Sequence, residues 1–108
     1  MTVLFVNAAF RENSRTYDLA QKYLSTLTDT VETVNLGEEN IRPLQKASLE
    51  QYCKDSRSHD FQDEMYRYAK QFAKADEIVI ASPFWNFGLP AVLHAYLELV
   101  CTQGITFD

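Results

Sequence analysis

The sequence predicts an α/β fold in which a parallel sheet carries helices on both faces. Three short segments, residues 3–6, 31–36 and 78–81, have the apolar or β-branched composition of strands. Amphipathic stretches with helical spacing lie between these segments and after the last of them. Because buried strands alternate with amphipathic helices, we expect crossover connections and therefore parallel strands.

The three expected strands differ in character. Residues 3–6 form a continuous apolar run, which is typical of a strand that is buried on both faces. Residues 31–36 are β-branched with polar interruptions, a pattern that favours an edge position. Residues 78–81 are again continuously apolar and predict a third buried strand.

Four helices are expected around this sheet. The apolar spacing predicts a helix over 15–28, for which Asn13 or Ser14 is a suitable N-cap. A short helix is expected at 47–54, and the polar stretch 55–60 predicts a loop. A longer helix is expected at 61–74, and the last helix begins with Pro90 in its first turn and continues to about residue 101.

Composition excludes several classes of function. The chain has 108 residues, of which 46% are hydrophobic and 13% aromatic, so it can build a core. Its formal charge of −5, without a basic stripe, argues against nucleic acid as a partner. The apolar run near the N-terminus is too short for membrane insertion or a secretory signal, so a cytoplasmic location is expected.

The two cysteines, Cys53 and Cys101, have neither CxxC nor metal-ligand spacing. We expect reduced thiols with a structural role, because free cysteines are commonly buried. A disulfide between the two is the alternative.

Two loops are expected at the edge of the sheet where ligands bind in doubly wound folds, beyond the carboxyl ends of the strands. The first loop ends at Ser14, Arg15 and Thr16, at the start of a helix. Free N–H groups, the helix dipole, two hydroxyls and a guanidinium favour a phosphate here. In the alternative interpretation Ser14 only caps the helix and Arg15 is solvated.

The second loop, residues 82–89, is unusually aromatic for a segment that follows a buried strand. It contains Pro83, Phe84, Trp85, Asn86 and Phe87. A rigid, apolar rim with fixed backbone donors suits a planar heterocycle. In the alternative interpretation Phe84 and Phe87 belong to the core and Trp85 to a partner interface.

The run from Pro83 to Tyr96 resembles the flavodoxin-like NAD(P)H dehydrogenase (quinone) and FMN-dependent NADH-azoreductase family. The turn at 14–16 resembles the phosphate loop of that family, and residues 104–107 resemble its Gly-x-x-Phe segment. The resemblance implies a flavodoxin-like three-layer α/β/α fold with strand order 2-1-3. It also implies that residues 1–108 are the N-terminal part of a single domain, with three of its five strands.

The resemblance further implies a flavin, FMN or alternatively FAD, and NADH or NADPH as electron donor. The implied cofactor-binding residues are Ser14, Arg15, Thr16, Pro83, Phe84, Trp85, Asn86 and Phe87. Quinones or azo compounds would be reduced by ping-pong hydride transfer in a homodimer. No catalytic side chain and no metal are expected, because the flavin carries the chemistry. One departure from the family pattern is the pair Ala8 and Ala9, where a hydroxyl or histidine is common.

Two other functions agree with the same residues. A flavodoxin-type electron carrier would also need an aromatic loop, but with one flavin edge exposed. A regulatory or interaction domain could keep the fold without the cofactor, which Ala8 and Ala9 would allow.

Overall fold

Three parallel strands form the sheet. The structure, a computed structural model, describes residues 1–84 and 88–107. The strands are β1 (Thr2–Asn7), β2 (Thr30–Asn35) and β3 (Glu77–Ala81). Their order is β2-β1-β3, which confirms the predicted order, and both pairings are parallel. In β1, residues 3–7 are all buried, as expected for a central strand covered on both faces.

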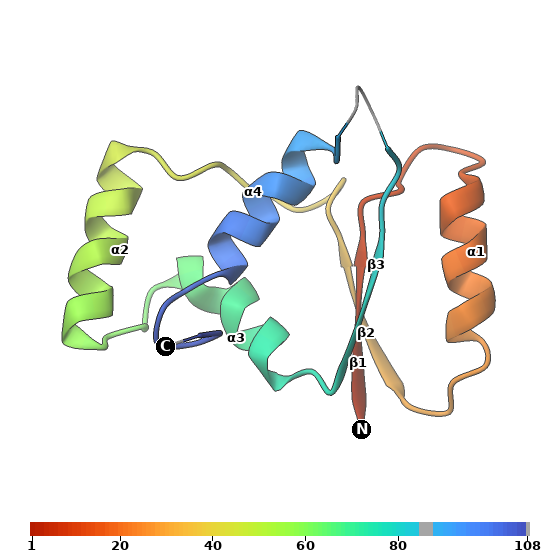
Figure 1. Cartoon of the computed structure of the whole chain (residues 1–108), viewed down its shortest axis with the longest axis horizontal. Helices are drawn as coiled ribbons and strands as arrows, with labels where there is room; N and C mark the ends of the chain where they lie inside the picture. The colour runs from red at the N-terminus through yellow and green to blue at the C-terminus, as the bar shows by residue number, and fades with distance from the viewer. Residues whose placement is uncertain (85–87, 108) are drawn as a thin grey trace.

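Helices cover both faces of the sheet. Figure 1 shows α1 on one side and α3 and α4 on the other, with α2 further out beyond α4. The helices are α1 (Arg15–Leu24), α2 (Lys46–Ser58), α3 (Arg67–Lys74) and α4 (Ala91–Val100), and a 3₁₀ turn, η1 (Glu64–Tyr66), leads directly into α3. The three-layer arrangement is therefore the flavodoxin-like one.

The core is divided by the sheet into two apolar clusters. Alternate residues of β1 point to opposite faces, so Val3 and Phe5 pack toward α1 whereas Leu4 and Val6 pack toward α3 and α4. The buried residues of the α1 side are Val3, Phe5, Ala9, Leu24 and Ala81. Those of the larger cluster are Leu4, Val6, Ala8, Val34, Leu36, Tyr68, Leu93, Tyr96 and Val100.

Three of the predicted helices, those at 15–28, 47–54 and 61–74, differ in extent from the observed ones. The first ends at Leu24 and not at residue 28, because the N–H groups of Thr26 and Leu27 bond to carbonyls only three residues back. The prediction of a helix starting at Phe61 is wrong. Asp63 caps the segment by accepting a hydrogen bond from the N–H of Met65 at 2.9 Å, so the chain becomes helical only from residue 64.

The predicted loop at 55–60 is also wrong, because α2 continues to Ser58. Asp55, on that helix, is only 6% exposed. Its carboxylate accepts a hydrogen bond of 2.6 Å from the hydroxyl of Tyr66 and two of 3.0 Å from the amide of Gln51. These hydrogen bonds lower the pKa of Asp55, the one from Tyr66 most. They also compensate for the burial of a polar residue within the helix.

A turn near residue 103 also contacts α2. The N–H of Gln103 donates to the hydroxyl of Tyr52 on α2 at 3.1 Å. Gly104 follows with φ of 95°, a conformation that favours glycine. A Cβ atom at this glycine would lie 3.0 Å from ring atoms of His59 and Phe61. Both φ and packing therefore require glycine at position 104.

Both cysteines are free and both are exposed, so the expected burial is wrong. Among residues 1–84 and 88–107, no helix combines the length and apolar character needed to cross a membrane.

Candidate functional site at the carboxyl edge of the sheet

The loops that follow β1, β2 and β3 begin side by side. The N–H of Ala8 donates to the carbonyl of Ala81 at 2.8 Å, and the N–H of Leu36 donates to the carbonyl of Asn7 at 3.0 Å. In Figure 1 the loops after β1 and β3 rise from the same end of the sheet, next to the start of α1. The turn at 14–16 and the start of the loop at Pro83 are therefore at one edge of the molecule, as predicted.

The turn before α1 has the geometry of a capped helix start. Asn13 adopts φ of 59°, a left-handed conformation in which asparagine is enriched. Ser14 follows as the N-cap and accepts a hydrogen bond of 3.2 Å from the N–H of Tyr17. Ser14 thus caps the helix, as the alternative interpretation proposed, and within residues 1–84 and 88–107 its hydroxyl donates no hydrogen bond, which leaves a donor for a ligand.

The N–H groups of Arg15 and Thr16 make no hydrogen bond within the described part of the chain. This is the normal condition of a first helical turn, where backbone donors have no intrahelical partner. Arg15 is exposed and Thr16 is partly buried. Together with the Ser14 hydroxyl, these groups are a donor set of the kind that a phosphate accepts.

A pocket of about 630 Å³ lies beside this turn, between the loops that follow β1 and β2. Its walls include Ser14, Arg11 and Tyr17 from the first loop and helix, and Gly37 and Glu38 from the loop after β2. Arg15, Thr16, Pro83 and Phe84 do not line it. The pocket therefore extends from the predicted turn toward β2 and not toward β3.

The floor of the pocket is held by Asn7, which is 4% exposed. Its side-chain N–H₂ donates to the side-chain oxygen of Asn35 at 3.0 Å, and its own oxygen accepts from the N–H of Ala9 at 3.0 Å. One buried amide thus ties the ends of β1 and β2 to the loop that leads to Ser14. Such a satisfied buried group fixes the positions of both loops.

Gly37 allows close contact between the two loops. A Cβ atom at this position would lie 2.8 Å from Cγ of Phe10, which is closer than side chains approach. Phe10, 44% exposed, also lines the pocket. Any larger residue at 37 would displace the phenyl ring and reshape this wall.

Sequence reasoning missed Arg11, Gly37 and Glu38 as pocket residues. Glu38 is exposed and lines the pocket, whereas Glu39 pairs with Arg67 at 3.5 Å. Their position directly after a strand, at the same edge as the predicted loops, was the available signal.

The loop after β3 is described only in part. Phe84 is 71% exposed, so the alternative that placed it in the core is wrong. Pro83 is partly buried, and its carbonyl accepts a hydrogen bond of 3.0 Å from the hydroxyl of Ser82. The predicted ring-lining residues Trp85, Asn86 and Phe87 lie outside the described residues.

Among the residues described, no group of three or more histidine, cysteine or acidic side chains is arranged to hold a metal ion. The polar groups that line the pocket are instead hydroxyls, amides, the guanidinium of Arg11 and the carboxylates of Asp18 and Glu38. The hydroxyls, amides and carboxylates suit a polar organic chain, and the guanidinium suits a phosphate.

A parallel sheet of order 2-1-3 with a polar pocket at its carboxyl edge defines a flavodoxin-like α/β protein. The chain belongs to the family described as "Flavodoxin-like fold", whose family model matches residues 1–108.

Curated relatives that resemble the chain include two bacterial proteins named FMN-dependent NADH:quinone oxidoreductase. The protein from Clostridium acetobutylicum is 34% identical over 97% of this chain, and the one from Coprothermobacter proteolyticus is 33% identical over 97%. In both cases the match covers 56% of the relative, so the chain spans about half the length of these proteins.

Solved structures agree with the family assignment. A crystal structure of azoreductase from Bacillus anthracis str. Sterne superimposes with a TM-score of 0.85 at 28% identity, covering 97% of this chain and 57% of that one. An FMN-dependent NADH-azoreductase from Bacillus anthracis str. Ames Ancestor, in complex with FMN, has a TM-score of 0.79 at 20% identity. The latter similarity shows the shared fold.

Proposed function

We propose that this chain is the flavin-phosphate-binding half of an FMN-dependent NADH:quinone oxidoreductase or azoreductase. The observation that carries the proposal is the capped turn at Ser14, whose free donors open at the same edge as the loop after β3. The names of the relatives from Clostridium acetobutylicum and Coprothermobacter proteolyticus support the same activity.

The donor set at the turn fits the phosphate of FMN. The Ser14 hydroxyl, the backbone N–H groups of Arg15 and Thr16 and the Thr16 hydroxyl would hold it at the positive end of α1. Arg11 lines the adjacent pocket and would add a guanidinium. Asn7 and Glu38 would face the polyol chain, for which amide and carboxylate oxygens are suitable acceptors.

The loop after β3 would line the flavin ring. Pro83, Phe84, Trp85, Asn86 and Phe87 are the proposed ring-contacting residues, chiefly through backbone groups and aromatic rings. When bound, FMN supplies the redox chemistry by accepting a hydride from NADH and passing electrons to a quinone or azo compound. The chain contributes binding, orientation and exclusion of water, and no side chain needs to act as general acid.

The proposal extends to the remaining properties of the family. We infer a homodimer and NADH as the donor, with NADPH and FAD as alternatives to be tested. Because NADH is an intracellular coenzyme, we also propose a cytoplasmic location.

Titration of the 108-residue chain with FMN and with riboflavin, followed by quenching of flavin fluorescence, tests the proposal. The two ligands differ only in the phosphate. We expect FMN to bind at least about tenfold more tightly, because one charge-assisted interaction contributes about 1.4 kcal/mol or more. Equal affinity for the two flavins, or no binding of FMN, would contradict the proposal.

A further inference from the structure

A second pocket, on the opposite side of the sheet from α1, has a different chemistry. Its volume is about 610 Å³, and it lies between the segment 40–45, the start of α2, α3 and α4. Leu44, Met65 and Leu99 supply apolar surface, and all three are only partly buried. A pocket of this size with an apolar floor can enclose a ligand of one or two rings.

Two guanidinium groups, from Arg42 and Arg67, also line this pocket, and Glu64 supplies its single carboxylate among the described residues. One of these two cations, Arg67, pairs with Glu39 at 3.5 Å, so Arg42 is the one without a carboxylate partner among the described residues. Arg42 is therefore the cation that an anion entering this pocket would meet.

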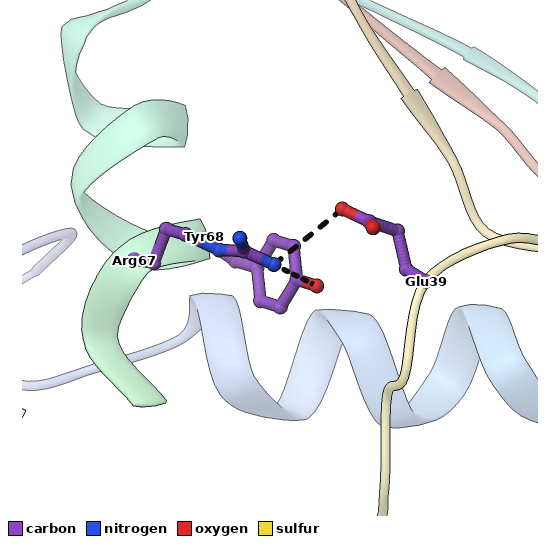
Figure 2. A network of polar contacts seen from close by, with 3 residues as sticks. All are labelled: Glu39, Arg67 and Tyr68. Atoms are coloured by element: carbon purple, nitrogen blue, oxygen red, sulfur yellow. Dashed lines mark hydrogen bonds and ion pairs between the residues drawn. The ribbon is translucent and has the colours of Figure 1, made fainter. Parts of the chain in front are cut away.

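Arg67 is held in place by its neighbours, as Figure 2 shows. Its Nη2 donates to the hydroxyl of Tyr68 at 2.6 Å and lies 3.5 Å from a carboxylate oxygen of Glu39. The guanidinium carbon also stands 4.6 Å from the centroid of the Tyr68 ring. Both polar contacts use Nη2, so the N–H groups on Nε and Nη1 have no partner among the described residues.

Arg42 makes fewer polar contacts than Arg67 within the described residues. Within the described residues its side chain makes one hydrogen bond, from Nε to the side-chain oxygen of Asn40 at 3.4 Å. No carboxylate pairs with it in that part of the chain. Arg42 is thus an exposed cation at the mouth of an apolar pocket.

We propose that this pocket binds an aromatic carboxylate. The ring would lie against Leu44, Met65 and Leu99, where a thioether beside an aromatic face is favourable. The carboxylate would accept hydrogen bonds from Arg42, with Arg67 as second donor, because a guanidinium matches a carboxylate in a bidentate pair. The site is separate from the carboxyl edge and goes beyond the flavin function.

Sodium 2-naphthoate is a suitable probe, with neutral 2-naphthamide as its matched control. The ¹⁵N-labelled 108-residue chain would be titrated with each compound and followed by amide chemical shifts. We expect saturable shifts at Leu44, Met65 and Leu99, and none at Ala9 or Ser14. Naphthamide is expected to bind about five- to tenfold more weakly, because it lacks the charge.

The variant Arg42→Gln should raise the Kd for naphthoate about five- to tenfold and leave the Kd for naphthamide unchanged. Arg57→Gln is the control variant, since Arg57 is an exposed arginine of α2 that does not line this pocket. It should leave both affinities unchanged.

Three results would overturn the proposal. These are shifts confined to the loop at 7–14, equal weakening by R42Q and R57Q, and equal affinity for the two compounds. Because neither probe is a flavin, failure here is distinguishable from failure of the proposed function.

Discussion

The hydroxyl of Tyr66 donates a hydrogen bond of 2.6 Å to the carboxylate of Asp55 and so joins η1 to α2. Both residues are almost fully buried, at 1% and 6% exposure. Burial, and then the neighbouring carboxylate, raise the pKa of Tyr66, whereas the same hydrogen bond lowers that of Asp55. The pair therefore exists as a neutral phenol and an ionised acid.

This pair predicts a pH-dependent contribution to stability. Tyr66→Phe should lower the free energy of unfolding by about 1–2 kcal/mol at pH 7, because a hydrogen bond to a charged group is lost. The pKa of Asp55 is lowered in the folded state, so the contribution is complete above the ordinary carboxyl pKa of about 4. The contribution is lost as the pH falls through the lowered pKa of Asp55.

Denaturant titrations of the wild type and Y66F at pH 7 and near pH 3 would measure the effect. In an Asp55→Asn background, Tyr66→Phe should cost the same at both pH values, because no titrating acceptor remains. A difference between wild type and Y66F that does not change with pH would contradict the assignment.

Ser14 allows capping to be separated from phosphate binding. Ser14→Ala should lower stability by about 1 kcal/mol, because the N–H of Tyr17 loses its acceptor. Ser14→Asn and Ser14→Asp both keep a capping oxygen and should keep the stability.

Only the aspartate places a negative charge where the FMN phosphate is proposed. S14D should therefore weaken FMN binding by about tenfold or more, relative to S14N. Fluorescence titration of the two variants measures this ratio. Equal FMN affinities of S14D and S14N would mean that the phosphate lies elsewhere.

Gly37 and Phe10 are predicted to be energetically coupled. Gly37→Ala places a Cβ 2.8 Å from the Phe10 ring and should cost about 1–3 kcal/mol by overpacking. In a Phe10→Ala background the same substitution should be neutral or slightly stabilising, since the unfolded chain loses entropy. A double-mutant cycle by thermal denaturation would test this, and additive costs would refute the coupling.

Tyr96 and Tyr68 pack against each other in the core but differ in the hydrogen bonding of their hydroxyls. Their rings meet edge to face with centroids 5.7 Å apart. Within the described residues, the buried hydroxyl of Tyr96 has no hydrogen-bond partner, and burial raises the pKa of Tyr96 to about 12. The hydroxyl of Tyr68, in contrast, accepts from Arg67.

Tyr96→Phe is therefore expected to raise the free energy of unfolding by about 1 kcal/mol, because an unsatisfied group is removed from the core. Tyr68→Phe should lower it by about 1 kcal/mol. Denaturant titration of the two variants gives both values, and equal destabilisation would show that the Tyr96 hydroxyl is satisfied.

The sheet was predictable from sequence because β1 and β3 are continuous apolar runs, β2 is rich in β-branched residues, and parallel crossovers allow few arrangements. The start of α1 was also predictable, because Ser14 is of a residue type that commonly caps helices. The extent of α2 was not predictable, because aspartate is common in loops. Asp55 is buried in this helix only through its contacts with Tyr66 and Gln51. The β2 wall of the carboxyl-edge pocket was missed for a similar reason, since Glu38 is a common surface residue until the fold places it beside Ser14.

The contacts that hold α2 against the rest of the chain suggest that this helix unfolds locally. Asp55 is the only buried residue among those of this helix, whereas five consecutive residues of β1 are buried. Breaking the junctions at Asp55 and Tyr52 could release α2 while the central sheet stays intact. Amide hydrogen exchange should then be fast in α2 and slow in β1. The protection of β1 amides, unlike that of α2 amides, should match the global free energy of unfolding. The outer helix would behave as an independent opening unit, governed by a few polar contacts.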